Sequence, residues 1–211
     1  MSPINTKTRI LNAAEKLFAR DGFHLTSLRR LTGLAKVNLA AVNYHFGSKE
    51  ALLQAVIERR LLPLNQIRME KIYAVLANAE QLKQPPAAES LLAAFIEPTL
   101  AFRHSSPGAD HFIALIGRSM SDANPTVRNC FLQLVAPLVQ LLLKGMQRAL
   151  PALPAEILLI RLQFCLAAMG HVMCASDRPT FSLPAMPQSL TDKELEQQLI
   201  QFSLAGLEAP Q

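Results

Sequence analysis

Four side chains on one short predicted helix have the sizes and hydrogen-bonding groups that suit contact with DNA bases. They are Asn38, Ala40, Ala41 and Asn43. An asparagine can pair with adenine through N6 and N7, and apolar methyl groups can meet the methyl of thymine. The types and spacing of these residues therefore predict a base-reading surface between positions 38 and 43.

Two short helices joined by a tight turn would hold this surface in place. The pattern predicts helices over 27–34 and 39–45, with Thr26 as the N-terminal cap of the first and Asn38 as that of the second. The apolar residues suited to hold the two helices together are Leu28, Leu31, Leu34, Val37, Val42 and Phe46. Such a pair is a helix-turn-helix unit, whose second helix lies in the DNA major groove.

The N-terminal domain carries all the excess positive charge of the chain. It consists of a predicted helix over 6–21 followed by the helix-turn-helix unit, and it spans residues 1–53. Residues 1–50 hold eight Lys or Arg against three Asp or Glu, which gives +5, while the remaining residues hold thirteen of each. Because DNA binding draws much of its affinity from Lys and Arg beside phosphates, this distribution favours DNA as a partner over a merely soluble basic surface.

The remaining residues, 54–211, predict a larger helical domain, so the expected fold class is all-α. Few of its segments alternate apolar and polar residues with a period of two. A long helix is expected from Ser48 to at least Lys71, with a bend at Pro63. Further helices are expected over 88–103, 109–119, 125–149, 155–175 and 191–207, with a proline-rich loop over 177–190.

The last two predicted helices offer surfaces for a second copy of the chain. The first carries the small residues Ala167, Ala168, Gly170 and Ala175, and the second carries an apolar stripe of Leu195, Leu199, Phe202 and Gly206. Since one helix-turn-helix unit reads only a half-site, a symmetric dimer is the usual solution. We expect a homodimer through residues 155–207, and packing against the chain's own core stays the alternative.

One apolar window, 157–175, approaches the length of a membrane span but contains Arg161 and His171. Two titratable groups favour a buried helix of a soluble protein, so no membrane partner is expected. The segment Met1–Thr8 is polar and lacks the apolar core of a secretory leader. The expected location is the cytoplasm, and the nucleoid when the protein is bound to DNA.

Several short motifs occur in the order and spacing of a known family. They are I-x-x-A-A-x-x-L-F-x-x-x-G from Ile10 to Gly22, Thr26-Ser27, Ala35-x-Val37, and the run YHFGSKEAL from Tyr44 to Leu52. Over about residues 8–56 the chain resembles the N-terminal domain of the tetracycline-repressor (TetR) family. The resemblance implies an all-helical homodimer that binds double-stranded operator DNA and releases it when a small molecule enters a C-terminal ligand-binding and dimerisation domain.

The resemblance also implies which residues contact DNA. Phosphate contacts are implied for Thr26, Tyr44, His45 and Lys49, and base-edge contacts for Leu39, Ala40, Ala41 and Asn43. The complete predicted set adds Ser27, Lys36 and Asn38. Lys36 departs from the family, which usually has glycine in this turn. Either the lysine adopts a left-handed conformation, at a cost of about 1 kcal/mol, or the turn differs slightly. Lys36 could also add a phosphate contact.

A second likeness concerns the C-terminal domain. The segment NLAAVNYHFGSK, together with Pro98, Arg118, Val127-Arg128 and the run from Leu150 to His171, resembles a branch of the family that regulates fatty-acid metabolism in proteobacteria. It implies a long-chain acyl effector, a fatty acid or an acyl-CoA. The apolar composition of residues 88–175, interrupted by a few arginines, separately suggests a cavity in which an anionic head would meet Arg118 or Arg103. The complete predicted ligand-binding set is Arg103, Phe112, Arg118, Met120, Phe164 and Met169.

Two other classes of function stay open. An enzyme acting on an acyl substrate would rest on the apolar C-terminal domain alone, since the sequence has no G-x-S-x-G motif, and no catalytic residue is proposed. An architectural DNA-binding protein without an effector would share the N-terminal domain. His104, Asp110 and His111 do not supply two histidines one helical turn apart, so neither a metal site nor a cofactor is expected.

Overall fold

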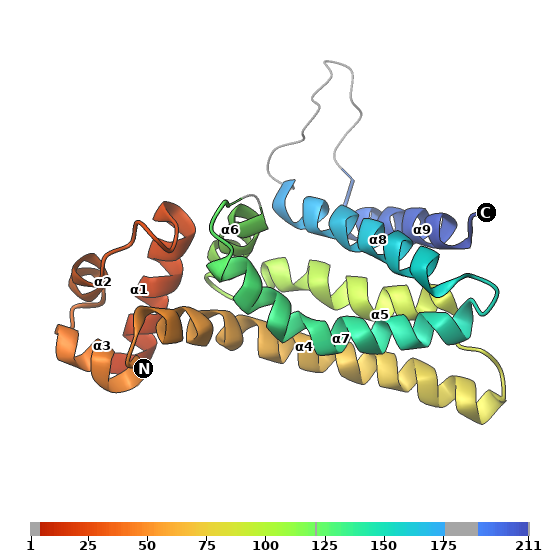
Figure 1. The fold of residues 1–211 in the computed structure, drawn as a ribbon, viewed down its shortest axis with the longest axis horizontal. Coiled ribbons are helices and arrows are strands. Elements are labelled where there is room, and N and C mark those ends of the chain that lie inside the picture. Colours follow the sequence, from red (N-terminus) through yellow and green to blue (C-terminus); the bar gives the residue numbers. More distant parts are fainter. Residues whose placement is uncertain (1–4, 121, 176–189, 211) are drawn as a thin grey trace, which may run out of the picture. The chain divides into compact units, whose positions relative to one another are not determined.

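The computed structural model describes residues 5–120, 122–175 and 190–210, and these are helical with no strand among them (Figure 1). The helices are α1 (Thr6–Asp21), α2 (Leu28–Ala35), α3 (Leu39–Phe46), α4 (Lys49–Leu82), α5 (Ala88–Ala101), α6 (Ala109–Met120), α7 (Thr126–Ala149), α8 (Ala155–Ala175) and α9 (Asp192–Glu208). A short 3-10 helix, Phe102–His104, follows α5. The predicted all-α class is confirmed. The proline-rich loop predicted over 177–190 lies, except for its last residue, outside the described residues.

The chain divides into two compact units. The N-terminal unit comprises Met1–Pro63 and His104–Val135, and the C-terminal unit comprises Leu64–Arg103 and Ala136–Gln211. These units differ from the predicted division between residues 53 and 54, because α6 packs against α1 and therefore joins the N-terminal unit. The long helix α4 continues through Pro63, where one unit gives way to the other.

Side-chain caps and left-handed turns set the limits of the first three helices. The side chains that accept a backbone N–H at the start of α1, α2 and α3 belong to Asn5, Ser27 and Asn38. The residues that end these helices with a positive φ are Gly22, Lys36 and Gly47. Each helix therefore begins and ends at a local signal, which fixes the short lengths that a helix-turn-helix unit needs.

The N-terminal unit has an apolar core built around α1. Ile10, Leu17 and Phe18 are almost fully buried, and the Phe18 and Phe23 rings pack edge to face, 5.3 Å apart. A buried carboxylate, Glu15, lies at the edge of this core and receives hydrogen bonds from both Arg59 and Arg60 of α4. Arg60 also donates to the Ser106 hydroxyl (2.7 Å) and to the Pro107 carbonyl (2.8 Å). This cluster joins α1, the first half of α4 and the loop before α6.

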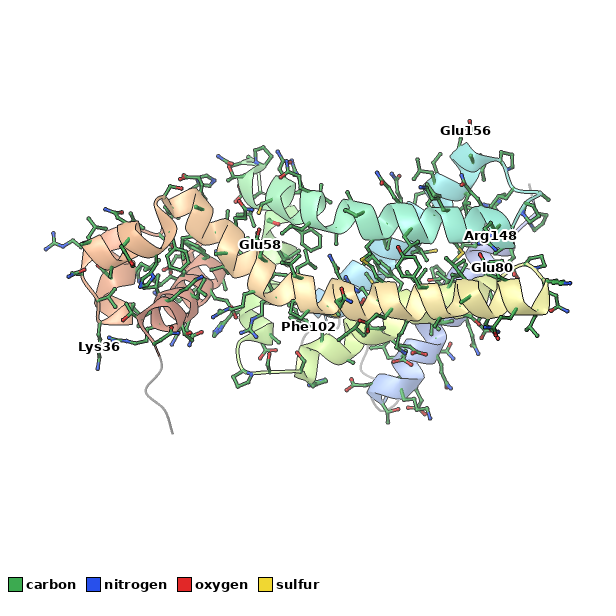
Figure 2. The ribbon with its side chains drawn as sticks, turned by 90° about the horizontal axis from the view of Figure 1, so that it is seen from below. Lys36, Glu58, Glu80, Phe102, Arg148 and Glu156 are labelled. Carbon is green, nitrogen blue, oxygen red and sulfur yellow. The ribbon has the colours of Figure 1, made fainter. Side chains whose placement is uncertain are left out.

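The C-terminal unit has a second core, to which α4, α5, α7, α8 and α9 contribute. Among its buried side chains are Ile72, Phe95, Leu142 and Leu162. At the surface of this unit, Arg148 of α7 lies beside Glu80 of α4, with 3.3 Å between Nη1 and Oε1 (Figure 2). Arg161 of α8 donates to the carbonyl oxygens of Leu207, Ala209 and Pro210, where α9 ends. These bonds satisfy carbonyl groups that the end of a helix leaves without partners.

The helix α8 is buried on one side only within the single chain, where Leu158, Leu162 and Cys165 enter the core. By length and composition α7 and α8 could each cross a membrane, although core helices pass the same test, and only 22% of the apolar window of α8 is buried in the single chain. Ile157 and Ile160 are exposed, and Phe164 is 67% exposed. The predicted burial of α8 therefore holds for one side of the helix, and its apolar pattern does not say which side the chain's own core covers.

Candidate nucleic-acid interface

The helix α3 has one fully buried side chain and exposes several of the residues predicted to read bases. Val42 is its buried residue, at 1% exposure. Ala40 and Asn43 are exposed, Leu39 is about half exposed, and Ala41 is partly buried. The predicted base-reading residues therefore lie on one short helix, and the exposed Asn43 carries the donor and acceptor that suit a base edge.

The turn between α2 and α3 depends on Lys36, which adopts the left-handed conformation with φ 53° and ψ 48°. This is the first of the two alternatives given above. The Lys36 N–H bonds back to the Gly33 carbonyl, and the Lys36 carbonyl accepts a hydrogen bond from Arg9 Nη2 of α1 (2.5 Å). The lysine side chain is exposed and points away from the ribbon (Figure 2). Arg9, which the sequence analysis did not single out, therefore braces the turn that sets the direction of α3.

The caps of α2 and α3 agree with the prediction in one case and correct it in the other. Asn38 caps α3 as expected, with its Oδ1 accepting from the Ala41 N–H at 2.8 Å. The cap of α2 is Ser27, not Thr26, and the Ser27 hydroxyl accepts from the Arg30 N–H. Thr26 is 1% exposed, and its hydroxyl donates to backbone carbonyls at the end of α1. The Thr26 hydroxyl is thus engaged within the chain, and its predicted contact with a phosphate stays a prediction.

The remaining predicted phosphate contacts lie at the end of α3 and the start of α4. Tyr44 is 87% exposed and packs edge to face with the half-buried His45. Lys49 places its Nζ 4.5 Å from the centre of the Phe23 ring and 3.4 Å from the His24 carbonyl. Burial lowers the pKa of Lys49 from its ordinary value. The DNA contacts of these side chains stay predictions.

A shallow hollow in the N-terminal unit gathers further positive charge. It measures about 260 Å³ and is lined by Arg9, Asn12, Lys16, Leu34 and Lys36, among others. Three cations around one hollow would attract a phosphate, since backbone charge is the main source of non-specific DNA affinity. The hollow lies beside the turn that Arg9 braces.

The predicted ligand-binding residues are divided between the two units. Phe112, Arg118 and Met120 belong to the N-terminal unit, whereas Arg103, Phe164 and Met169 belong to the C-terminal unit. Phe112 is buried and Met120 is 43% exposed, while Met169 is buried and Phe164 faces solvent. Arg118 donates to the Arg20 carbonyl (3.0 Å), where α1 ends. The role of these six side chains in ligand binding stays a prediction.

One buried cation in the C-terminal unit was missed by the sequence analysis. Arg68 of α4 is 4% exposed, and it donates to the Thr99 hydroxyl through Nε (3.0 Å) and Nη2 (2.6 Å) and to Asn65 Oδ1 through Nη1 (3.0 Å). Its guanidinium carbon lies 4.7 Å from the centre of the Phe95 ring. Burial lowers the pKa of Arg68 to about 9. One sequence signal for the burial of Arg68 was its helical spacing, because Asn65 and Arg68 fall on the same helix face as the buried Ile72.

Comparison with known proteins gives the class of this chain. Residues 10–56 match the family described as "Bacterial regulatory proteins, tetR family". Residues 93–206, more than half of the chain, match the family described as "Tetracyclin repressor-like, C-terminal domain". The chain is therefore a helix-turn-helix protein with an effector-type C-terminal domain. It belongs to the TetR family of transcriptional regulators.

Among the individual relatives, the regulator UidR of Escherichia coli strain K12 is 44% identical over 52 residues. That match covers 25% of this chain and 26% of UidR. The chain thus aligns with about a quarter of the length of this curated relative. The matched families and relatives are regulators and not enzymes, which confirms the prediction on that point.

Two solved structures are similar in fold over nearly the whole chain. The fatty acid degradation regulator FadR from Bacillus halodurans has a TM-score of 0.67 at 13% identity, covering 99% of both chains. FadR from Bacillus subtilis, solved in complex with stearoyl-CoA, also has a TM-score of 0.67 at 13% identity, covering 94% of this chain and 97% of that one. At such low identity the likeness concerns the fold.

Proposed function

We propose that this protein is a ligand-responsive transcriptional repressor that binds palindromic double-stranded operator DNA as a homodimer. The observation that carries the proposal is α3, which buries Val42 and exposes Asn43 on a unit with a net charge of +5 over its first 50 residues. Operator recognition combines base reading by a short helix with the attraction of DNA phosphates to the basic side chains around it. Such a protein works in the cytoplasm, on the nucleoid.

The proposed dimer interface is the uncovered apolar face of α8 with the neighbouring exposed side of α9. Phe164 is 67% exposed, and Phe202 of α9 is 70% exposed. Ala167 and Gly170 are exposed on α8, and a β-carbon added to Gly170 would meet no atom of this chain within 4 Å. Large aromatic groups beside small residues suit the close approach of a second copy of the same two helices.

The proposed effector is a long-chain acyl compound held by the core of the C-terminal unit. In support, this core is apolar and includes Met146 and Met169, whose flexible side chains can adapt to a ligand. FadR of B. subtilis, which shares the fold, binds stearoyl-CoA in its structure. An effector lowers DNA affinity only if it binds the non-operator conformation more tightly. We expect α4 to transmit the effect of ligand binding to the DNA-binding helices, because it is one continuous helix to which both units contribute residues.

The test is the affinity of the full-length dimer for a selected operator, at fixed salt, with and without oleate or oleoyl-CoA. We expect one of the two compounds to weaken binding by about 5- to 150-fold, the usual range of allosteric coupling. If neither compound changes the operator affinity or the unfolding temperature, the acyl effector is excluded. Sequence-specific binding without any effector response would then favour the architectural alternative.

A further inference from the structure

The guanidinium of Arg68 is a buried positive charge that has only neutral partners among the described residues. A guanidinium has five donor hydrogens. Three are used on the oxygens of Thr99 and Asn65, which leaves two for another acceptor. The Thr99 hydroxyl is neutral, so it does not offset the charge of Arg68, and it gives its own hydrogen to the Phe95 carbonyl (2.6 Å). The neighbouring charges Lys71 and Glu97 pair with each other at the surface (2.8 Å).

Three partly buried arginines of this protein, Arg59, Arg60 and Arg161, each face a full or a partial negative charge. Arg59 and Arg60 share the carboxylate of Glu15, and Arg161 meets carbonyl oxygens where α9 ends, at the negative end of the helix dipole. An isolated buried charge is costly, and truncating such a residue to an uncharged one normally relieves that cost. A charge kept in this position without a counter-ion therefore indicates that an anion from outside the described chain completes the site.

We propose that Arg68, with Asn65 and Thr99, binds the carboxylate of the effector. This inference rests on the acyl effector proposed above and narrows it, from an acyl compound in general to one with a free carboxylate. A carboxylate offers two charged oxygens to the remaining guanidinium donors, which is the strong form of an arginine hydrogen bond. The carbonyl of a CoA thioester is neutral and offers no such counter-charge. The site therefore selects the free acid over its CoA ester.

The position of Arg68 also indicates where the apolar part of the ligand lies. The guanidinium stacks on Phe95, and Phe95 and Ile72 belong to the same buried cluster as Met146 and Met169. An acyl chain attached to a carboxylate at Arg68 would extend among these side chains, displacing the methionines most readily because they have no branch point.

The experiment compares full-length wild type, Arg68→Gln, Arg68→Lys and the control Arg148→Gln, an arginine of the same unit whose ion pair is exposed. Binding of oleate, oleyl alcohol and oleoyl-CoA is measured by calorimetry, and unfolding temperature is measured without ligand. We expect wild type and Arg148→Gln to bind oleate best. Arg68→Gln should raise the Kd for oleate by about 30-fold or more, the lower end of the effect of truncating a buried charge pair. The Kd of Arg68→Lys for oleate should lie between those of wild type and Arg68→Gln.

The measurement without ligand separates this role from a purely structural one. If an anionic ligand completes the Arg68 site, Arg68→Gln without ligand should unfold at the same temperature as wild type or at a higher one. A large loss of stability, or a failure of Arg68→Gln to fold, would show that the neutral hydrogen bonds alone explain the arginine and would overturn the inference. Binding of oleate by Arg68→Gln within threefold of wild type would overturn it as well. If the protein bound oleoyl-CoA but not oleate, the inference about Arg68 would be overturned and the proposal of an acyl effector would stand. If it bound neither compound, both proposals would be overturned.

Discussion

Glu15 of α1 and Arg60 of α4 form a buried ion pair in which the arginine reaches both carboxylate oxygens. Arg60 Nη2 lies 2.7 Å from Glu15 Oε1, and Arg60 Nε lies 3.1 Å from Oε2. The Glu15 side chain is 2% exposed and that of Arg60 is 14% exposed. Because Arg60 also bonds to the loop before α6, this pair ties the helix-turn-helix domain to the neighbouring segment of the N-terminal unit.

Glu15→Gln should therefore lower the free energy of unfolding by about 3–5 kcal/mol, the range for breaking a buried pair and leaving a charge behind. The measurement is urea unfolding followed by circular dichroism. The matched control is Glu80→Gln, whose ion pair with Arg148 is exposed, and its effect should be about 1 kcal/mol or less. Equal effects of the two substitutions would mean that the Glu15 cluster does not stabilise the unit.

Gly108→Ala, in the loop before α6, should disturb the same cluster of Glu15 and Arg60. Gly108 has φ +90°, and a β-carbon there would lie 2.5 Å from Arg60 Nη2 and 2.6 Å from Glu15 Oε1. We expect a loss of about 1–3 kcal/mol from backbone strain and from displacement of the ion pair. Gly33→Ala is the control, since a β-carbon at this helical position meets nothing within 4 Å and should be neutral or stabilising by up to about 1 kcal/mol. A neutral Gly108→Ala would contradict the close approach seen here.

Much of the fold was predictable because its signals are local. The cap at Asn38, the capping box of Thr191 and Glu194, and the glycine after α1 each act within four residues, and the structure contains all three. Thr26 and Ser27 are adjacent residues with similar capping preference, so the sequence did not distinguish the buried one from the cap. The contacts of Glu15 and Arg68 join residues more than thirty positions apart, and no local pattern reports such a pairing.

The ligand-binding residues were harder to predict for a related reason. Arginines within apolar helices drew attention to Arg103 and Arg118, but α4 is rich in charged residues, so Arg68 looked like one more surface charge. The structure shows Arg68 buried and Arg118 bonded to the end of α1. Burial of one charge among many on a helix depends on which face meets α5, and the sequence alone left that face open.

Gly170→Leu should convert the proposed dimer to monomers. Its side chain would meet no atom of its own chain near the backbone, so a change in association would report contact with a second copy. Light scattering after size exclusion measures the mass over a range of concentrations. Gly33→Leu, at a helical glycine outside α8 and α9, is the control and should stay dimeric. A dimer that survives Gly170→Leu, and also Phe164→Glu, would place the interface elsewhere.

The pH dependence of stability should reveal the buried charge of Arg68. Burial lowers the pKa of Arg68 from its ordinary value in the unfolded chain to about 9. Between these values the unfolded chain holds a proton that the folded chain releases, so stability rises with pH across this window. Arg68→Gln should thus be more stable than wild type at pH 7.5, and its advantage should shrink as pH rises through about 9 towards 10.5. A constant difference across that range, measured by urea unfolding, would argue against a buried cation.

The most direct test of the central claim is selection of DNA duplexes from a random pool by wild type, Asn43→Ala and Tyr44→Ala. We expect wild type to enrich a palindrome with half-sites about one helical turn apart, or a multiple of it. Tyr44 is an exposed predicted phosphate contact, so its loss should weaken binding to every duplex and leave the enriched sequence unchanged. Asn43→Ala should alter the preference within each half-site by about 1–3 kcal/mol at one base pair. Enrichment of no symmetric sequence by wild type, or the same sequence with the same preference for Asn43→Ala, would contradict base reading by α3.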